Sequence, residues 1–412
     1  MSKYLIKFTP AEPYFFGKEK TLAYKIKEPQ SEVDANKETP LRIAQSLYFA
    51  RSEDTPSQST ILGALRLLLL LDNGRSSTDF SEFSDCENAL VGEHSFKPDM
   101  EHAMGTSPFG CIKSVSPVFI MNKADEMFIP VPLDHNTKNG CGAYAPFEIF
   151  EKMETLDGKK LFSYEYNPKD EPVSGFVSLS DGKIWANLIE PNTQIGINRR
   201  KGNDGFFKRE MKMLKKDHSF AVICELACKA DKDGVLRNEE NRNITEYDWN
   251  NSAPLKRTAY LGQGRSAFAV EIKKYNEPDL GIKTAEFLTE RHKTRSCAKC
   301  YEQFAFVYCL GDAFMKPNKY KSVLFAVTHT RDYRALTTEL SGKKQDGPTG
   351  IYVKKDSHDM YHMLKAGSVL MFENEEKANE WIAAMGNEAA KTIGFNTFVT
   401  VPTCVRNDAL TQ

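Results

Sequence analysis

Basic and aromatic residues are concentrated in one short stretch, residues 199–216. Its eight basic residues are Arg199, Arg200, Lys201, Lys208, Arg209, Lys212, Lys215 and Lys216. Only Asp204 and Glu210 oppose them, so the local charge is +6 in a chain whose net charge is −1. Phe206 and Phe207 lie in the middle of the stretch. Basic side chains that contact phosphates, beside aromatic rings on which bases stack, are typical of proteins that bind single-stranded nucleic acid.

The same stretch predicts a β-hairpin, because Gly202-Asn-Asp-Gly205 lies between two extended arms. We interpret the hairpin as a nucleic-acid contact. The alternative is purely structural: a solvated basic hairpin whose two phenylalanines pack beneath a sheet.

A second candidate contact is the glycine-rich turn Leu261-Gly-Gln-Gly-Arg-Ser266. Its glycines allow a backbone to approach a ligand closely, and Arg265 and Ser266 carry groups that bind phosphate or a base edge. The turn lacks the third glycine and following helix of a dinucleotide-binding fingerprint, and it lacks the Gly-Lys-Ser/Thr of a phosphate-binding loop.

A third candidate lies on the helix predicted over residues 55–71. Thr55 is the expected N-cap, Pro56 the first helical residue, and Gln58 completes a capping box. Five apolar residues form the predicted core stripe of this helix: Ile61, Leu62, Leu65, Leu68 and Leu69. Ser59, Gly63 and Arg66 share another face, which either holds a phosphate near the helix N-terminus or merely surrounds the cap.

Catalytic signatures are absent from the sequence. There is no Gly-x-Ser-x-Gly, no His-Glu-x-x-His and no kinase or GTPase motif, and the eight histidines are scattered. Cys297 and Cys300 have metal-ligand spacing, but no second pair follows at zinc-finger distance. We therefore expect a chain that is not an enzyme and holds neither a cofactor nor a metal.

Composition bounds the class of protein. A chain of 412 residues with 41% hydrophobic and 27% charged residues is globular and long enough for two or three domains. The sequence shows neither a signal peptide nor an apolar run long enough to span a bilayer. Nine cysteines without secretory context favour reduced thiols. These features predict a cytoplasmic protein.

Short strands with few helices and long loops predict an α+β fold built on antiparallel sheets. An alternating strand opens the chain at residues 3–9, and further strands are predicted at 218–226, 303–310 and 367–372. Composition turns polar within residues 227–257, so we divide the chain into an N-terminal domain, 1–240, and a C-terminal domain, 241–412.

Several stretches, in this order, resemble type III CRISPR effector subunits of the RAMP superfamily. The matching stretches are Tyr14-Phe-Phe-Gly17, Ser57-Gln-Ser-Thr-Ile-Leu-Gly-Ala-Leu-Arg66, Ile195-Gly-Ile-Asn-Arg-Arg200, Gly205-Phe-Phe-Lys-Arg-Glu210, Leu261-Gly-Gln-Gly-Arg-Ser266, Leu364-Lys-Ala-Gly-Ser-Val-Leu-Met-Phe372 and Ile393-Gly-Phe-Asn396. The last of these departs from the family pattern, which has a glycine pair there. Among such subunits, the chain is most similar to the Cmr-type (type III-B) subunits that cap the complex.

The resemblance implies two ferredoxin-like domains and a role without catalysis in a CRISPR antiviral ribonucleoprotein. It implies that the chain grips the 5′ handle of the CRISPR RNA and docks on the large polymerase/cyclase subunit and a backbone subunit, meeting target RNA only indirectly. Two alternatives stay open: a metal-independent RAMP endoribonuclease that processes precursor CRISPR RNA, with Tyr260 beside the glycine turn, and the equivalent capping subunit of a Csm-like complex. The expected RNA contacts are Arg66, Arg199, Arg200, Lys201, Phe206, Phe207, Lys208, Arg209, Gln263, Arg265 and Ser266.

Overall fold

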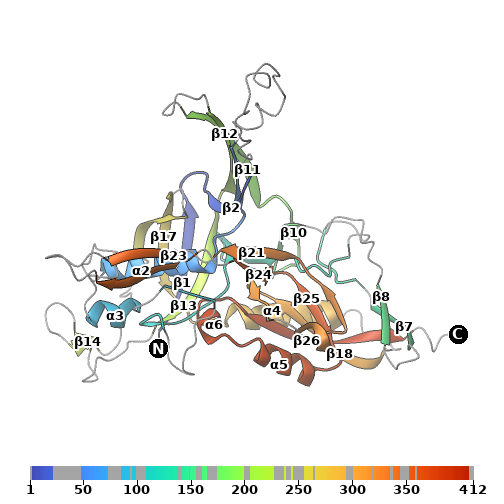
Figure 1. The fold of residues 1–412 in the computed structure, drawn as a ribbon. Coiled ribbons are helices and arrows are strands. Elements are labelled where there is room, and N and C mark those ends of the chain that lie inside the picture. Colours follow the sequence, from blue (N-terminus) through green and yellow to red (C-terminus); the bar gives the residue numbers. More distant parts are fainter. Residues whose placement is uncertain are drawn as a thin grey trace, which may run out of the picture.

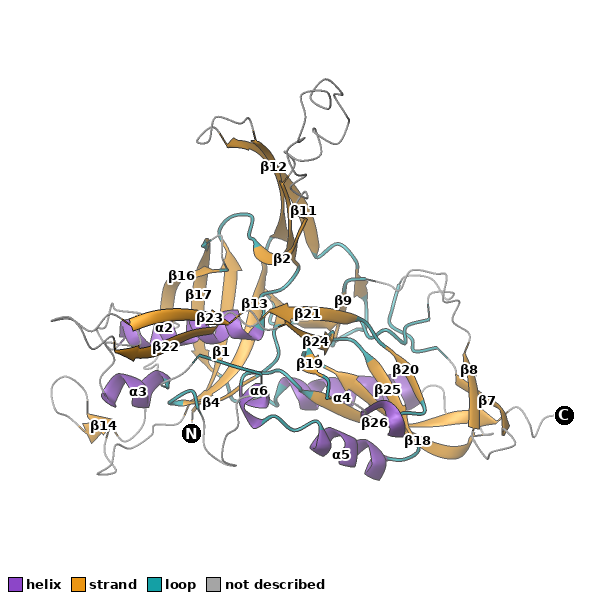
Figure 2. Cartoon of the chain, viewed as in Figure 1, coloured by secondary structure: helices purple, strands orange, loops and turns teal. Residues whose placement is uncertain are grey.

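The computed structural model describes residues 2–21, 48–72, 85–92, 95–98, 108–136, 142–147, 149–154, 160–164, 174–198, 205–226, 236–237, 243–244, 255–262, 265–293, 300–316, 319–334, 337–343, 352–357 and 360–407. Over these residues the fold is mixed α+β, with mostly antiparallel sheets and few helices (Figure 2). The predicted fold class is thereby confirmed. None of the described helices is long and apolar enough to cross a membrane.

The largest sheet has nine strands and is built around β1 (Ser2–Pro10), which pairs with β13 (His218–Leu226) and β17 (Ser266–Lys274). The other strands are β4 (Ile112–Val115), β5 (Phe119–Asn122), β6 (Met127–Pro130), β9 (Phe176–Ser178), β10 (Ile184–Trp185) and β16 (Leu255–Leu261). The order β5-β13-β1-β17, antiparallel throughout, is the strand order of a ferredoxin-like βαββαβ unit. Because β16 and β17 follow residue 240, this sheet crosses the predicted division between residues 1–240 and 241–412.

Helices α2 (Gln58–Asp72) and α3 (Asp85–Val91) bury their apolar side chains in the same core as one face of this sheet. The predicted stripe of α2 is confirmed, since Ile61, Leu65 and Leu69 are fully buried beside the β1 residues Ile6 and Phe8. Complete burial of each such side chain contributes roughly 1.5–3 kcal/mol. The leucine-rich sequence therefore fixes α2 against the sheet.

A second sheet has six strands in the order β20-β25-β18-β26-β7-β8. They are β7 (Ile149–Glu154), β8 (Lys160–Tyr164), β18 (Cys300–Cys309), β20 (Phe325–Val327), β25 (Val369–Phe372) and β26 (Phe398–Asn407). Its first four strands are again antiparallel and again follow the ferredoxin-like order. β7 and β8 come from the N-terminal half of the chain, so this sheet also crosses the predicted division.

Helix α4 (Leu280–Lys293) packs against β26 and contributes to the core shared by the two large sheets, while α5 (Glu375–Ala384) covers the opposite face of the second sheet. The short helix α6 (Glu388–Thr392) follows α5 and contacts β4. A buried polar chain also joins the halves: Tyr144 and Tyr308 donate hydrogen bonds to the Asp134 carboxylate at 2.8 and 2.7 Å. The Tyr308 hydroxyl lies 2.6 Å from Nε2 of His292 on α4.

The remaining strands form smaller sheets. One has the order β11-β12-β3-β2, with β2 (Phe16–Thr21), β3 (Tyr48–Glu53), β11 (Ile189–Asn198) and β12 (Gly205–Leu214). Another has the order β19-β24-β21, with β19 (Ala313–Phe314), β21 (Thr330–Arg334) and β24 (Met360–Leu364); η4 (Lys319–Ser322) is a short 3-10 helix. Two-stranded pairs are β14 (Leu236–Arg237) with β15 (Asn243–Ile244) and β22 (Thr337–Lys343) with β23 (Tyr352–Ser357). Figure 1 shows β11 and β12 projecting away from the two large sheets.

Candidate nucleic-acid interface

The predicted basic hairpin is present. β11 and β12 pair antiparallel from Ile189↔Leu214 to Asn198↔Gly205, and residues 199–204 between them lie outside the described residues. Arg199, Arg200 and Lys201 therefore stay predictions. The backbone of Phe206 and Phe207 belongs to β12, whereas their side chains lie outside what the structure describes.

The hairpin is extended into a sheet by β3, which pairs with β12 in parallel. Lys208 is directly opposite Ile195 on β11 and Phe49 on β3, so these three side chains share one face. On that face the Lys208 ammonium lies 5.1 Å from the centroid of the Phe49 ring, and the Arg51 guanidinium lies 4.9 Å from the same centroid. We call Phe49, Arg51 and Lys208 the cation–aromatic strip.

The charges of the cation–aromatic strip are available for a ligand. Arg51 and Lys208 are both exposed, and within the described ranges neither has a carboxylate at ion-pair distance. Lys212, four positions further along β12, differs: its ammonium lies 3.2 Å from Asp54 and 3.4 Å from Glu210. The strip thus combines an aromatic ring with two cations that are not neutralised by described neighbours, as recognition of a stacked base and its phosphates requires.

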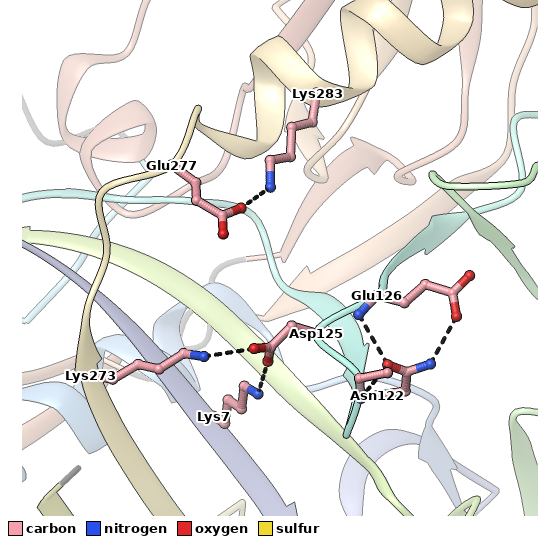
Figure 3. A network of polar contacts seen from close by, with 8 residues as sticks. Lys7, Asn122, Asp125, Glu126, Lys273, Glu277 and Lys283 are labelled. Atoms are coloured by element: carbon pink, nitrogen blue, oxygen red, sulfur yellow. Dashed lines mark hydrogen bonds and ion pairs between the residues drawn. The ribbon is translucent and has the colours of Figure 1, made fainter. Parts of the chain in front are cut away.

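A contrasting arrangement of basic residues occurs on the first large sheet (Figure 3). Asp125, at the β5–β6 turn, accepts hydrogen bonds from Lys7 at 2.5 Å and from Lys273 at 2.9 Å. These two ammonium groups hold the pKa of the Asp125 carboxyl below its ordinary value, the hydrogen bond from Lys7 being the largest cause. Their charge is therefore partly compensated inside the molecule, unlike that of the cation–aromatic strip.

Arg209 points to the other face of the hairpin sheet. Its guanidinium lies 4.0 Å from the centroid of the Phe15 ring, and Phe15 forms a small buried cluster with Ala50 and Met211. Arg209 is half-buried, so its aliphatic stem and its guanidinium face pack on the protein itself. The structure therefore gives Arg209 a role in holding the base of the hairpin on the Phe15 segment.

The glycine-rich turn approaches this same segment. Oγ of Ser266 accepts a hydrogen bond from the Phe15 backbone N–H at 3.2 Å, and the Ser266 side chain is buried. Gly262 has φ +73°, and a Cβ atom there would lie 2.5 Å from the Phe15 carbonyl oxygen. The sequence predicted that Gly262 lets a ligand approach the backbone closely. In the structure the group that lies close to Gly262 is the Phe15 carbonyl of the same chain, and the Ser266 hydroxyl accepts its hydrogen bond from the Phe15 N–H. The RNA contact expected of Ser266 stays a prediction, and in this structure its hydroxyl is engaged by the Phe15 N–H.

Arg265 is exposed at φ +49°, within the turn, and Gln263 lies outside the described residues. Tyr260, which precedes the turn on β16, is 59% exposed. Through Phe15, the structure connects the two predicted contact regions, the hairpin and the glycine turn, which lie about fifty residues apart in sequence.

Arg66 does not lie on an exposed face. It is 6% exposed, and its guanidinium carbon lies 5.2 Å from the centroid of the Phe109 ring. Burial lowers the Arg66 pKa to about 10, because the charged form loses solvation. The long side chain turns inward toward Phe109, whereas Gly63 on the same helix is exposed, so the structure buries Arg66 and its RNA contact stays a prediction.

The start of α2 also differs from the prediction. Ser57, rather than Thr55, caps the helix, because its Oγ accepts a hydrogen bond from the Thr60 N–H at 3.3 Å. Gln58 is buried, and with its amide oriented to satisfy both partners it accepts from the Val118 N–H at 2.8 Å and donates to the Ile393 carbonyl at 2.9 Å. The helix entry is therefore joined to protein from both halves of the chain, which favours the capping interpretation over a phosphate site.

The C-terminal stretch Ile393-Gly-Phe-Asn396 meets this helix entry. A Cβ atom on Gly394, which has φ +91°, would lie 2.7 Å from the Ser116 carbonyl oxygen and 2.9 Å from the Gln58 amide. Asn396, at φ +48°, accepts a hydrogen bond from the Phe314 N–H at 2.8 Å. The two sequence landmarks at 57–66 and 393–396 thus form an internal junction.

Phe49 and Arg51 were missed as site residues by the sequence analysis. The run Arg51-Ser-Glu-Asp54 is polar like a loop, but residues 51–53 complete β3. A parallel pairing between strands more than 150 residues apart leaves no local sequence signal. The available hint was an aromatic residue two positions before an arginine in a strand-like segment, which places both on one face.

Metal ligation finds no support among the residues that the structure describes, since no group of three or more His, Cys, Asp or Glu side chains has the required proximity there. Cys297 lies outside those residues. Three cysteines of the described chain, Cys111, Cys224 and Cys309, are buried thiols that form no disulfide. Burial raises the pKa of the Cys224 and Cys309 thiols well above the ordinary value.

Comparison with known proteins gave structural neighbours only. No family model matches the chain, and no curated protein matches it. The chain is similar to a chain in the cryo-EM structure of the type III-B Cmr-beta complex bound to cognate target RNA, with TM-score 0.43, 11% identity and coverage of 96% of both chains. In the same complex with target RNA and AMPPnP the values are TM-score 0.42, 12% identity, and 96% and 95% coverage. A chain of the Csm3-Csm4 subcomplex of the type III-A CRISPR-Cas interference complex gives TM-score 0.31 and 12% identity over 89% of this chain and 92% of that one.

Proposed function

We propose that this chain is a non-catalytic RNA-binding subunit of a type III CRISPR ribonucleoprotein, and that it holds the 5′ handle of the CRISPR RNA. The observation that carries the proposal is the cation–aromatic strip on the projecting hairpin sheet, where Arg51 and Lys208 both lie over Phe49. The identity of the RNA and of the complex comes from the resemblance of the sequence motifs.

In this proposal a base stacks on the Phe49 ring, and the two cations contact the phosphates on either side of that base. Single-stranded RNA exposes its bases for such stacking, whereas a duplex does not. Each stacked base contributes about 1–3 kcal/mol, and the phosphate contacts make the affinity salt-dependent. The basic residues of the hairpin turn, Arg199, Arg200 and Lys201, extend the same positive charge along the sequence.

Arg209 and the glycine turn take a supporting role in this account. Arg209 packs on the Phe15 ring, and Ser266 accepts a hydrogen bond from the Phe15 N–H. Both contacts fix the base of the hairpin against the first large sheet. Arg265 is exposed beside that base and is the candidate for a second phosphate contact. Docking on the large polymerase/cyclase subunit and on a backbone subunit is part of the proposal and rests on the resemblance.

The test is equilibrium binding of the purified chain to a single-stranded 5′ handle RNA and to a scrambled RNA of equal length. Salt is varied from about 50 to 300 mM, because the slope of log affinity against log salt counts the phosphates contacted. We expect a steep slope and a clear preference for the handle. Absence of binding to either RNA, also when the neighbouring subunits are supplied, contradicts the proposal; binding without preference supports RNA binding but assigns handle recognition to another subunit.

The endoribonuclease alternative is tested with the same protein. Precursor CRISPR RNA, incubated with the chain in a chelator, is expected to remain intact. If it is cut, and if Tyr260→Phe abolishes the cut, then the chain is an enzyme and the non-catalytic part of the proposal fails.

A further inference from the structure

β11 is the outer strand of the hairpin sheet, since the strand order is β11-β12-β3-β2. Thr193, Gln194 and Ile195 are exposed one after another along it, so both of its faces are open to solvent there. Ile195 is 74% exposed, the largest value among the exposed large apolar residues of the described chain. An apolar side chain this exposed on a strand edge needs a reason beyond folding.

Residues along β11 alternate between those that hydrogen-bond to β12 and those that do not, and this alternation shows which backbone groups point away from the hairpin. The Lys215 N–H donates to the Leu188 carbonyl, so the even-numbered residues of β11 pair with β12. The odd-numbered ones, including Thr193 and Ile195, direct N–H and C=O away from the hairpin. Pro191 fits this alternation, because it is odd-numbered and needs no N–H for pairing with β12. Its register partner Lys212 exchanges backbone hydrogen bonds with Tyr14 and not with β11.

Beyond Pro191 the sequence of the outward edge lacks the residue types that usually protect a strand edge. Residues 193–198 read Thr-Gln-Ile-Gly-Ile-Asn, with no charged residue and no proline. Strand edges in natural proteins are commonly blocked by lysine, proline or a covering segment, because free N–H and C=O groups pair with any extended chain. The only proline of β11 lies at the base of the strand, at Pro191, and Thr193, Gln194 and Ile195 beyond it are exposed.

We propose that the outer edge of β11 at residues 193–197 receives an extended segment of another protein, which adds to the hairpin sheet as a fifth strand. The segment is uncharged or acidic and places an apolar side chain beside Ile195. Charge favours this occupant over a second copy of the chain, because pairing of two β11 edges would join two hairpins that each carry a local charge of +6 over residues 199–216. Alternating outward donors and acceptors also suit a peptide backbone better than RNA, whose phosphates only accept. The backbone edge of β11 is not part of the cation–aromatic strip, although the Ile195 side chain lies on the same face of the sheet as Lys208 and Phe49.

The test measures, by fluorescence anisotropy, the binding of a capped heptapeptide to the full chain. The peptide alternates threonine and valine and has a glutamate at each end. The control peptide has the same sequence but is N-methylated at alternate amides, which removes backbone donors on one edge. The diagnostic variant is Ile195→Pro, which removes one outward N–H and no hydrogen bond to β12. The matched control is Gln194→Ala. Gln194 is the exposed residue next to Ile195, but its backbone N–H and C=O point toward β12.

We expect saturable binding of the unmodified peptide, weakened about tenfold or more by Ile195→Pro and by N-methylation, and unchanged by Gln194→Ala. Circular dichroism and RNA affinity of both variants should match those of the parent chain, which separates an edge effect from misfolding. Equal binding of the two peptides, or no binding of either, overturns the proposal. Self-association that Ile195→Pro abolishes, seen by sedimentation, also overturns it and assigns the edge to a second copy.

Discussion

Replacing Phe49 with leucine separates stacking from simple packing. Leucine keeps an apolar side chain of similar size beside Lys208 and Arg51 but has no aromatic face. Since a base stacked on an aromatic ring contributes about 1–3 kcal/mol, Phe49→Leu is expected to raise the Kd for single-stranded RNA by roughly 5- to 150-fold. The free energy of unfolding should fall by less than about 1.5 kcal/mol, because the swap conserves most of the volume.

Arg51→Gln and Lys208→Gln test the other half of the cation–aromatic strip. Each removes one expected phosphate contact, so each should reduce the magnitude of the salt slope by about 0.7 for a single strand. The matched control is Lys377→Gln, an exposed lysine on α5, which lies far from the hairpin (Figure 1). Affinities are measured by fluorescence anisotropy at five or more salt concentrations.

An unchanged Kd for Phe49→Leu, together with salt slopes equal to that of Lys377→Gln, would refute the reasoning. RNA binding would then reside elsewhere, in the hairpin turn or beside Arg265. A loss of affinity without a change of slope in the Gln variants would instead show that the cations position the ring and do not touch phosphate.

Three further perturbations test the fold around the site. Gln58→Leu leaves the Val118 N–H and the Ile393 carbonyl without their partner, so urea unfolding should show a loss of about 2 kcal/mol or more; a loss below about 0.5 kcal/mol contradicts the junction. Gly63→Ala adds a Cβ atom with nothing within 4 Å, so it should stabilise α2 by about 0.5–1 kcal/mol in the same assay and leave RNA affinity unchanged, unless RNA approaches that face. Asp125 has a folded-state pKa below the ordinary value of 3.8, so its stabilising contribution is present above about pH 4 and lost as the pH falls further; Asp125→Asn should flatten the acid limb of stability against pH, and an identical acid limb in the variant contradicts this.

Sequence patterns predicted those elements whose formation depends on residues close together along the chain. The hairpin at 199–216 followed from a glycine-bounded turn between two arms, and its arms are β11 and β12. The α2 core stripe followed from three- and four-residue spacing of leucines. The N-cap of α2 nevertheless lies two residues after the predicted one, at Ser57 and not at Thr55. Both residues offer a hydroxyl group, and only the path of the chain selects between them.

Long-range pairings were beyond the reach of sequence patterns. β3 joins β12 in parallel, and only that pairing brings Phe49 and Arg51 to Lys208. Arg66 looked like a surface residue by helical spacing, yet arginine has a stem long enough to turn inward when an aromatic face is available, here Phe109. The division near residue 240 followed composition, whereas the sheets combine strands from both sides of it.

The central claim, that RNA lies on the cation–aromatic strip, is tested most directly by zero-length ultraviolet cross-linking of the chain to handle RNA, followed by mass spectrometry of the cross-linked peptides. The experiment is done on the chain alone and on the chain assembled with its neighbouring subunits. We predict that the main cross-links fall on Phe49 of β3 and on the β12 arm of the hairpin. Cross-links confined to other surfaces, such as α4, α5 or the second large sheet, would contradict the account.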